Sequence, residues 1–326
     1  MPPRWVDLHC DVLNKMTENV KISFLDDARL DITYERMQQG GIGLQCFAIY
    51  LSQHWGQARF EYILNSIDVF RNRVLPTGEG LQWLKWKDEV ERVRDSKSKW
   101  GMLSIEGADG LEGNLFYVKT AFELGVRFLG VTWNYANWAA DGILEQRNGG
   151  FTAKGRQLVE LCHEIGMLLD VSHLSTAGFW ELVDLTRRPF IASHSNAHAI
   201  CEHPRNLRDE QIKAIVALDG RIGLTFVPWF VKTTDDLVTS EDLLYHIEHM
   251  CGLGAEKHLM FGSDFDGIET WISGLEHPGQ YPDFVELLLK HYSEAQVTGW
   301  LSGNALTFLE HHLPNRLIGS RNPDLR

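Results

Sequence analysis

The stretch Met167-Leu-Leu-Asp-Val-Ser-His173 is a short apolar run that ends in polar side chains. Seven further runs of this kind recur along the chain, and each is followed by a longer amphipathic segment. Near-continuous apolar runs of this length are typical of parallel strands that are buried on both faces. The eight predicted strands cover residues 5–9, 42–50, 101–106, 128–133, 167–173, 190–194, 222–227 and 259–264.

The segments between these strands are predicted to be helices. In residues 60–74, apolar side chains recur at the i, i+3, i+4, i+7 spacing that places them on one helix face. Thr152 and Ser175 are the expected N-caps of two further helices. Similar helical patterns cover residues 152–165, 175–185, 209–218 and 240–251, and three more helices are expected at 281–289, 293–301 and 304–311.

Eight strands that alternate with helices predict an α/β protein built as a single (β/α)8 TIM-type barrel. The barrel is expected to form one domain over residues 1–326, with a C-terminal helical extension at about 276–312 packed on it. A doubly wound open sheet is the structural alternative. Its nucleotide-binding form is disfavoured, because no GxGxxG or GxxxxGK sequence follows a predicted strand.

Composition and charge exclude several classes of protein. The 326 residues are 44% hydrophobic and 23% charged, which excludes a disordered chain. The net charge of −13 would repel phosphates and anionic lipids, so neither nucleic acid nor membrane is an expected partner. Five cysteines without a CxxC pair favour a reducing compartment. Because the sequence shows no signal peptide and no apolar stretch near the ~20 residues of a membrane span, the expected location is cytoplasmic.

Polar side chains are concentrated where five of the predicted strands end. The carboxyl ends of parallel barrel strands meet on one face, so these side chains are expected to converge where barrel active sites are built. Side chains alternate along a strand, so His9 and Asp11 point the same way and Cys10 points the other way. The five strand ends are Asp7-Leu-His9-Cys-Asp11, Ile105-Glu106-Gly107, Asp170-Val-Ser-His173, Ala192-Ser-His194-Ser-Asn and Gly262-Ser-Asp264-Phe-Asp266-Gly.

Together these strand ends predict a metal site, although each has an ordinary structural explanation alone. Glu106-Gly107 could be a turn, and Ser263-Asp264 could cap a helix. Imidazole and carboxylate ligands without thiolate suit Zn²⁺, and also Mn²⁺, Co²⁺ or Fe²⁺. Two pairs of terminal ligands and a bridging carboxylate suit a two-metal site that activates a shared water. Asp264 would then be a spare carboxylate, available as general base or proton shuttle.

Taken in order, these motifs resemble those of the membrane (renal) dipeptidase family, peptidase family M19, within the amidohydrolase-type barrels. The resemblance runs nearly end to end, and the ordered set of motifs is far more specific than any one of them. The matching segments are Asp7-Leu-His9-Cys-Asp11, Ser104-Ile-Glu106-Gly107, Asp170-Val-Ser-His173-Leu-Ser, Ala192-Ser-His194-Ser-Asn-Ala, His203-Pro-Arg205-Asn206-Leu, Gly262-Ser-Asp264-Phe-Asp266-Gly, Tyr281-Pro-Asp283, and Glu294 followed by Gly303-Asn304.

The resemblance implies a metallo-dipeptidase with two Zn²⁺ ions. His9 and Asp11 would hold one ion, His173 and His194 would hold the other, and Glu106 would bridge the two. A metal-bridging hydroxide would attack the peptide carbonyl of a dipeptide and release two amino acids. Dipeptides with a C-terminal D-residue are included in the expected substrates, and a homodimer is the assembly that the family suggests.

The resemblance also implies roles for residues beside the metals. Arg205 would bind the C-terminal carboxylate of the substrate through its guanidinium fork, with Asn206 as a neighbouring substrate-binding residue. Asp264 would bind the free amino group, handle the proton, or both, so Asp264 and Glu106 are the expected catalytic residues. Without the family, the segment around Arg205 could instead make a surface salt bridge or a helix-cap contact.

One position departs from the family pattern. The better-known members have a histidine at the end of the fourth strand, thought to stabilise the oxyanion, and here Thr132-Trp133-Asn134 occupies that place. Trp133 offers one indole N–H and cannot titrate. Either another group, such as Asn134 or the metal, supplies the missing contact, or the enzyme is slower or differently selective. The other interpretation is that Trp133 simply forms a wall of the pocket. Trp133 and Asn134 are both expected to bind substrate.

Two other functions stay open at this point. A different amidohydrolase would act on N-acyl amino acids, cyclic amides or lactams, and it would accept substrates that lack a free amine. A catalytically silent barrel would serve as a binding protein, but such a protein is expected to have lost metal ligands. All five candidate ligands and Asp264 are present in this chain.

Overall fold

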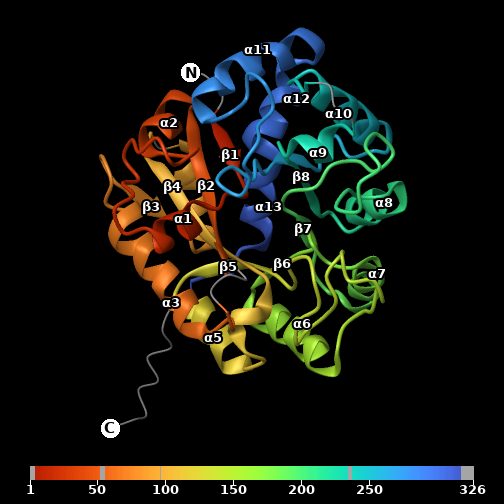
Figure 1. The fold of residues 1–326 in the computed structure, drawn as a ribbon. Helices are drawn as coiled ribbons and strands as arrows, with labels where there is room; N and C mark the ends of the chain where they lie inside the picture. Colours follow the sequence, from red (N-terminus) through yellow and green to blue (C-terminus); the bar gives the residue numbers. More distant parts are fainter. Residues whose placement is uncertain (1–3, 52–55, 96, 234–236, 317–326) are drawn as a thin grey trace.

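The computed structural model of the protein describes residues 4–51, 56–95, 97–233 and 237–316. Strands and helices alternate along most of this length, and the strands stand in the middle of the molecule with helices around them (Figure 1). Within these ranges, no helix is both long and apolar enough to cross a lipid bilayer.

Eight parallel strands form the barrel that the sequence predicts. They are β1 (Trp5–Asp7), β2 (Ile42–Tyr50), β4 (Lys99–Glu106), β5 (Val126–Gly130), β6 (Leu168–Asp170), β7 (Ile191–Ala192), β8 (Arg221–Leu224) and β9 (Leu259–Phe261). Their hydrogen-bonded order is β2, β1, β9, β8, β7, β6, β5, β4, and β2 also pairs with β4. That last pairing closes the barrel, so the open-sheet alternative is wrong.

The short strand β3 (Leu81–Trp83) is not predicted by the sequence. It pairs with the first residues of β4, from Lys99 to Gly101, whereas β5 pairs with β4 from Leu103 onward. Strand β3 therefore lies beside the barrel and is not one of the eight strands that close it. Three residues are too few to show the alternation of apolar and polar side chains that marks a strand.

The predicted helices form close to their expected bounds. The expected helix at 60–74 is α3 (Phe60–Val69), continued by a π-helical turn, η2 (Phe70–Val74). Thr152 and Ser175 act as N-caps, because each side chain accepts a hydrogen bond from a backbone N–H three residues later. The other predicted helices are α6 (Ala153–Ile165), α7 (Thr176–Leu185), α8 (Asp209–Ala217) and α10 (Asp242–Gly252).

Further short helices lie in the connections between strands. They are α1 (Val12–Glu18), α2 (Tyr34–Gln39), η3 (Lys87–Glu89), α4 (Val90–Asp95), η4 (Ala108–Leu111), α5 (Leu115–Glu123) and α9 (Pro228–Val231). A further short helix, η5 (Pro278–Gln280), follows the last strand. The C-terminal extension consists of α11 (Tyr281–His291), α12 (Glu294–Thr298), the π-helical η6 (Gly299–Gly303) and α13 (Asn304–His312).

Helix α13 is visible through the barrel in Figure 1 and contacts β8 and β9. Its side chains Leu306 and Phe308 belong to the same buried cluster as Val6 and Met102 of the barrel strands. The extension thus adds apolar side chains to the barrel interior. The polar side chains of the strands gather at the opposite, carboxyl end.

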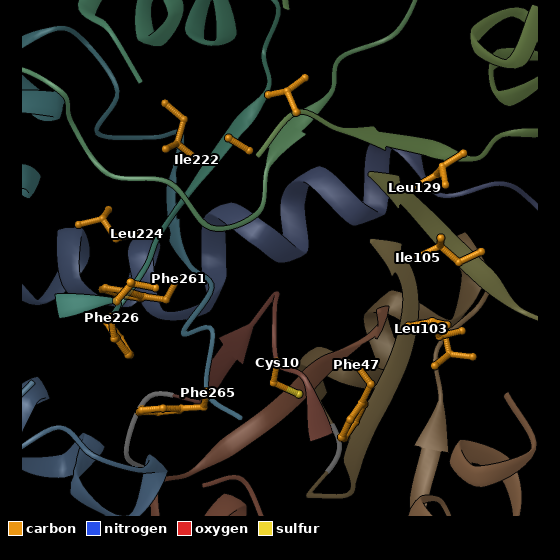
Figure 2. Close-up of a cluster of buried hydrophobic side chains, with 14 of the residues drawn as sticks. Cys10, Phe47, Leu103, Ile105, Leu129, Ile222, Leu224, Phe226, Phe261 and Phe265 are labelled. Carbon is orange, nitrogen blue, oxygen red and sulfur yellow. The ribbon is translucent and has the colours of Figure 1, made fainter. Parts of the chain in front are cut away.

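Strand β4 shows how the barrel separates apolar packing from polar chemistry. Leu103 and Ile105 belong to the large buried cluster that the strands share with the helices (Figure 2). Met102, on the other face, belongs to the interior cluster, and Ser104 and Glu106 follow it on that face toward the carboxyl end. The interior face of β4 therefore changes from apolar to polar along its length and brings Glu106 to the rim.

Candidate metal centre

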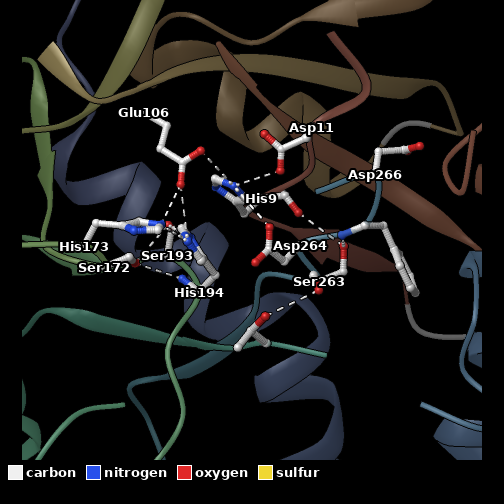
Figure 3. Close-up of polar contacts among 12 residues, drawn as sticks. His9, Asp11, Glu106, Ser172, His173, Ser193, His194, Ser263, Asp264 and Asp266 are labelled. Atoms are coloured by element: carbon white, nitrogen blue, oxygen red, sulfur yellow. Dashed lines mark hydrogen bonds and ion pairs between the residues drawn. The ribbon is translucent and has the colours of Figure 1, made fainter. Parts of the chain in front are cut away.

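Six of the side chains predicted at the strand ends lie together at the carboxyl end of the barrel (Figure 3). Each comes from the end of β1, β4, β6, β7 or β9, or from the residues just after it. Their side chains are only 1–16% exposed, which is unusual for groups that carry charge. The six are His9, Asp11, Glu106, His173, His194 and Asp264.

Glu106 stands between two groups of potential metal ligands. Its Oε1 lies 2.7 Å from Nε2 of His173 and 3.5 Å from Nε2 of His194. Its Oε2 lies 3.8 Å from Nε2 of His9, which is itself 3.5 Å from Oδ2 of Asp11. Within each group the ligand atoms all lie within 4.8 Å of one another. The arrangement fits two cations that share the carboxylate of Glu106.

The imidazoles of His173 and His194 face each other through their Nε2 atoms, which are 2.9 Å apart. The Nδ1 atoms make other contacts, to Oδ1 of Asn134 at 2.8 Å and to Oγ of Ser193 at 2.8 Å. Burial lowers the pKa of both rings well below the usual value, and the charge of Arg205 adds to this effect. Two neutral rings with converging Nε2 atoms are suited to bind a cation.

His9 lies in a more acidic environment. Its Nε2 has no hydrogen-bond partner among the described residues, although carboxylate oxygens of Asp11, Glu106 and Asp264 lie 3.5–3.8 Å away. Burial disfavours the charged ring, but these carboxylates outweigh it and raise the pKa of His9 to about 10. Burial in turn raises the pKa values of Asp11 and Glu106. So much buried negative charge fits a bound divalent cation.

Asp264 lies within ligand distance of both groups, since its carboxylate, His9 and His194 place ligand atoms within 4.8 Å of one another. Burial and the nearby carboxylates raise the pKa of Asp264 well above its usual value. Its backbone φ is +67°, in the left-handed region that non-glycine residues rarely adopt. A Cβ on Gly267 would stand 2.3 Å from Oδ2 of Asp11 and 2.7 Å from Oδ1 of Asp264, so only glycine leaves room for both carboxylates.

A cavity of about 730 Å³ opens onto these residues. Its wall includes Arg205, which is 4% exposed and therefore not in a surface salt bridge. Nη2 of Arg205 donates to the carbonyl of His194 at 3.4 Å, while Nε and Nη1 have no partner among the described residues. Burial lowers the pKa of Arg205 to about 10, so it keeps its charge at neutral pH. A buried guanidinium with free donors favours an anionic ligand.

Asn206 does not fit the substrate-binding role that the sequence suggests. Its Nδ2 donates to the carbonyls of Cys201 at 2.9 Å and Phe230 at 2.8 Å, and its Oδ1 accepts from the backbone N–H of Asn196 at 3.2 Å. These hydrogen bonds occupy the amide group of Asn206 and hold the loop of Arg205 against α9. The sequence places Asn206 next to Arg205 but does not show that the two side chains point in different directions.

Trp133 and Asn134 both line the cavity. The indole of Trp133 packs 5.3 Å from the ring of Tyr50 and 6.1 Å from the ring of His173, as an aromatic wall. Asn134 makes a further contact that the sequence does not reveal: its Oδ1 lies 2.8 Å from Nδ1 of His173. Asn134 thus orients a candidate metal ligand, His173.

Sequence reasoning gives no role to the polar residues behind the ligands. Asp7 accepts hydrogen bonds from the backbone and hydroxyl of Ser263, at 2.9 and 2.7 Å, and Asp170 does the same for Ser193. Both aspartates begin motifs that the sequence singles out, and both serines directly precede a functional residue. Their position in those motifs is the one signal that could have identified them.

Comparisons with known proteins show the family to which the chain belongs. The family model of membrane dipeptidases, peptidase family M19, matches residues 3–315. The dipeptidase aclJ of Aspergillus oryzae is 34% identical over 212 residues, which cover 64% of this chain and 50% of that protein. An uncharacterized dipeptidase of Schizosaccharomyces pombe is 27% identical over 92% of this chain and 79% of its own length.

Solved structures show the same fold. The dipeptidase AC, described as a metallopeptidase of family M19, has a TM-score of 0.87 at 26% identity and covers 96% of this chain and 99% of that one. A metallopeptidase of Rhodobacter sphaeroides, liganded with a phosphinate mimic of the dipeptide L-Ala-D-Ala, has a TM-score of 0.86 at 25% identity, over 95% and 99% of the two chains. The chain therefore belongs to the membrane dipeptidase family, peptidase family M19, whose members are metallo-hydrolases that act on peptide bonds.

Proposed function

We propose that the protein is a zinc-dependent dipeptidase with two metal ions at the carboxyl end of the barrel. The observation that carries this proposal is the position of Glu106 between two ligand groups, in a cavity that also presents the unpaired guanidinium of Arg205. The first feature matches a two-metal hydrolase. The second matches a substrate with a free carboxylate.

His9 and Asp11 would hold one zinc ion, His173 and His194 would hold the other, and Glu106 would bridge them. When bound, the two ions would polarise the scissile carbonyl and lower the pKa of the attacking water. The chain supplies only nitrogen and oxygen ligands for this purpose, a set that Mn²⁺, Co²⁺ or Fe²⁺ can also use. The metals that the enzyme carries are thus part of the test.

Arg205 binds the C-terminal carboxylate of the dipeptide in this proposal. Its Nε and Nη1 have no partner among the described residues, its side chain lines the cavity, and its guanidinium lies 5.4 Å from the ring centre of Phe230, which limits the directions it can take. A fixed guanidinium fork can hold a carboxylate by two parallel hydrogen bonds. This anchor sets the distance from the substrate carboxylate to the metal ligands and so favours peptides of two residues.

Asp264 handles the proton of the reaction. Its carboxylate is 3.7 Å from Nε2 of His9 and reaches the cavity. It can accept the proton of the attacking water and then donate it to the nitrogen of the leaving amino acid. The same carboxylate is available to the free amino group of the substrate. Trp133, which offers no titratable group, contributes the apolar wall beside Tyr50.

Dipeptides with a C-terminal D-residue are included among the proposed substrates. Support comes from the Rhodobacter sphaeroides metallopeptidase, whose structure holds a mimic of L-Ala-D-Ala.

The test combines elemental analysis of the purified protein with a small panel of substrates. We expect two zinc ions per chain and hydrolysis of L-Ala-L-Ala and L-Ala-D-Ala, with little hydrolysis of N-acetylated L-Ala-L-Ala. Faster cleavage of the N-acetylated or a cyclic amide substrate would instead identify an amidohydrolase of another specificity. A protein that binds metal but cleaves none of these would contradict a hydrolytic function.

A further inference from the structure

Asp170 sits behind the imidazole half of the site and collects four hydrogen bonds from two serines. Its Oδ1 accepts from the backbone N–H of Ser172 at 3.1 Å, from the hydroxyl of Ser172 at 2.9 Å and from the backbone N–H of Ser193 at 2.9 Å. Its Oδ2 accepts a short hydrogen bond from the hydroxyl of Ser193. All three residues are buried, at 2–8% exposure. The two hydroxyl oxygens also lie 3.2 Å from each other, but their closer contacts are to the carboxylate of Asp170, the stronger acceptor, so each hydroxyl donates its one proton to Asp170.

This arrangement determines which nitrogen of His194 carries a proton. Oγ of Ser193 lies 2.8 Å from Nδ1 of His194 and has already donated its proton to Asp170. The hydroxyl of Ser172 cannot supply another, because it donates to Asp170 and accepts from the backbone N–H of His194 at 3.0 Å. Nδ1 of His194 must then donate to Ser193, which leaves the lone pair on Nε2, the atom that faces Glu106.

The acidic half of the site contains a similar aspartate–serine pair, Asp7 and Ser263, but its hydrogen bonds do not reach a ligand ring. Asp7 accepts from the backbone and hydroxyl of Ser263, and its Oδ2 also accepts from the hydroxyl of Tyr281 at 3.2 Å. The hydroxyl of Ser263 lies 3.2 Å from the backbone carbonyl of His9, so its contacts end at backbone. The unit at Asp170 is thus distinguished by its contact with a ligand ring.

We propose that Ser193 is a positioning residue that fixes the tautomer of His194 through a relay of hydrogen bonds to Asp170. The inference rests on the proposed metal-binding function and deepens it. In the relay, the proton of Nδ1 is held by Ser193 and the proton of Ser193 is held by Asp170. His194 therefore presents a lone pair at Nε2 without first having to move a proton. Partners of this kind behind a ligand typically change metal affinity by about 10–100-fold.

Three variants of the full-length protein test the relay. Ser193→Ala removes the hydroxyl that links His194 to Asp170. We expect the dissociation constant of the more weakly bound zinc ion to rise by about 10–100-fold. Asp170→Asn reverses the relay, because the amide would donate to Ser193, which could then donate to Nδ1 and leave the proton of His194 on Nε2. Ser172→Ala is the control, since it removes a buried hydroxyl that contacts Asp170, Oγ of Ser193 and the backbone N–H of His194 but not the ring of His194; we expect no more than about a 3-fold change.

The measurements are zinc competition against a chromogenic chelator, thermal unfolding, and ¹⁵N NMR of protein labelled at histidine. In the zinc-free state, wild-type and Ser172→Ala proteins should show an Nδ1–H of His194, and Asp170→Asn should show the proton at Nε2. Equal zinc constants for Ser193→Ala and Ser172→Ala, or an unchanged Nδ1–H in Asp170→Asn, would overturn the relay. If Ser193→Ala unfolds, the NMR result on Asp170→Asn decides. A wild-type protein that fails to bind two zinc ions contradicts the proposed function, which separates that failure from failure of the relay.

Discussion

The two halves of the metal centre prepare their ligands in different ways. The half that contains His9 and Asp11 is rich in carboxylates, and three of them lie within 3.8 Å of Nε2 of His9. Around His173 and His194 the rings are neutral, and hydrogen bonds to Asn134 and Ser193 hold their outer nitrogens. In the proposed centre, one half would attract a cation chiefly by negative charge, and the other by nitrogen lone pairs that already point toward the binding position.

The comparison shows why Glu106 is the residue on which both halves depend. Each of its oxygens faces a different half, so it adds charge to the neutral pair and joins the acidic pair to it. The barrel makes this possible because Glu106 ends β4 on the interior face, and β4 lies two strands from β1 on one side and two strands from β6 on the other. A change at Glu106 should therefore affect both halves, whereas a change at another ligand should affect one.

Glu106→Gln should produce the largest effect of any single change. The amide keeps the shape of the side chain but removes its charge and one acceptor oxygen, so both halves lose a ligand. We expect fewer than two metal ions per chain and a fall in kcat/KM of at least about 10³-fold, beyond the ~10–100-fold typical of a residue behind a ligand. Glu310→Gln, in an exposed ion pair with Arg94, is the matched control and should change neither quantity.

Asp11→Ala and His194→Ala break one half each. Each variant should lose one metal ion and at least about 10²-fold in activity, because a direct ligand is worth more than the residue behind it. Elemental analysis and kinetics on the same preparations check both quantities. A metal-free variant that keeps full activity would show that these residues are not the ligands.

Arg205→Ala leaves both halves intact and removes the substrate anchor. A buried charged partner is worth about 2–5 kcal/mol when truncated, so KM for dipeptides with a free carboxylate should rise by roughly 10²-fold or more. Both metal ions should remain. Kinetics on carboxyl-amidated dipeptides provide the control, and an equal loss on these substrates would argue against carboxylate binding. The stability of the variant should not fall, because an unpaired buried cation is itself unfavourable.

The smallest predicted effect is on the pH dependence of stability, and it comes from His246. This buried histidine lies outside both halves of the candidate metal centre. Its Nδ1 accepts from the backbone N–H of Ala197 at 3.0 Å, and its Nε2 lies 2.9 Å from the carbonyl of Val231, so this buried ring is neutral without being a ligand. Burial lowers its pKa from 6.5 to about 4. Its contribution to stability is complete above pH 6.5 and is lost as the pH falls toward 4, by about 2 kcal/mol at pH 5.

Urea unfolding of wild-type and His246→Gln proteins at pH 7 and pH 5 checks this expectation. The free energy of unfolding of the wild-type protein should drop more between the two pH values than that of the variant, because only the wild-type protein must protonate this ring. An equal drop in both proteins would mean that His246 does not carry the effect.

Much of the fold, and the gathering of the candidate ligands at one end of the barrel, can be predicted from the sequence for a clear reason. Buried parallel strands need nearly continuous apolar runs, and Glu106, His173 and Asp264 stand out because they end such runs. The direction of a side chain that follows a strand is harder to predict. Asn206, beside Arg205, donates to backbone carbonyls, and Asn134 contacts His173. Both contacts depend on neighbouring loops whose positions the sequence does not reveal.

The residues behind the ligands escape prediction for a related reason. Ser193 and Asp170 acquire their roles only through the pairing of β6 with β7, which brings together positions 23 residues apart. β3 is missed because its three residues carry too little pattern. The sequence shows which polar residues reach the rim, and the register of neighbouring strands decides what each of them touches.

The most direct test of a two-metal centre bridged by Glu106 is anomalous diffraction at the zinc edge from crystals of the protein grown with zinc. Two anomalous peaks are expected, about 3.5–4 Å apart. One should lie between His9 and Asp11, the other between His173 and His194, with the carboxylate of Glu106 between the peaks. A single peak, or two peaks that do not share Glu106, would contradict the proposed centre.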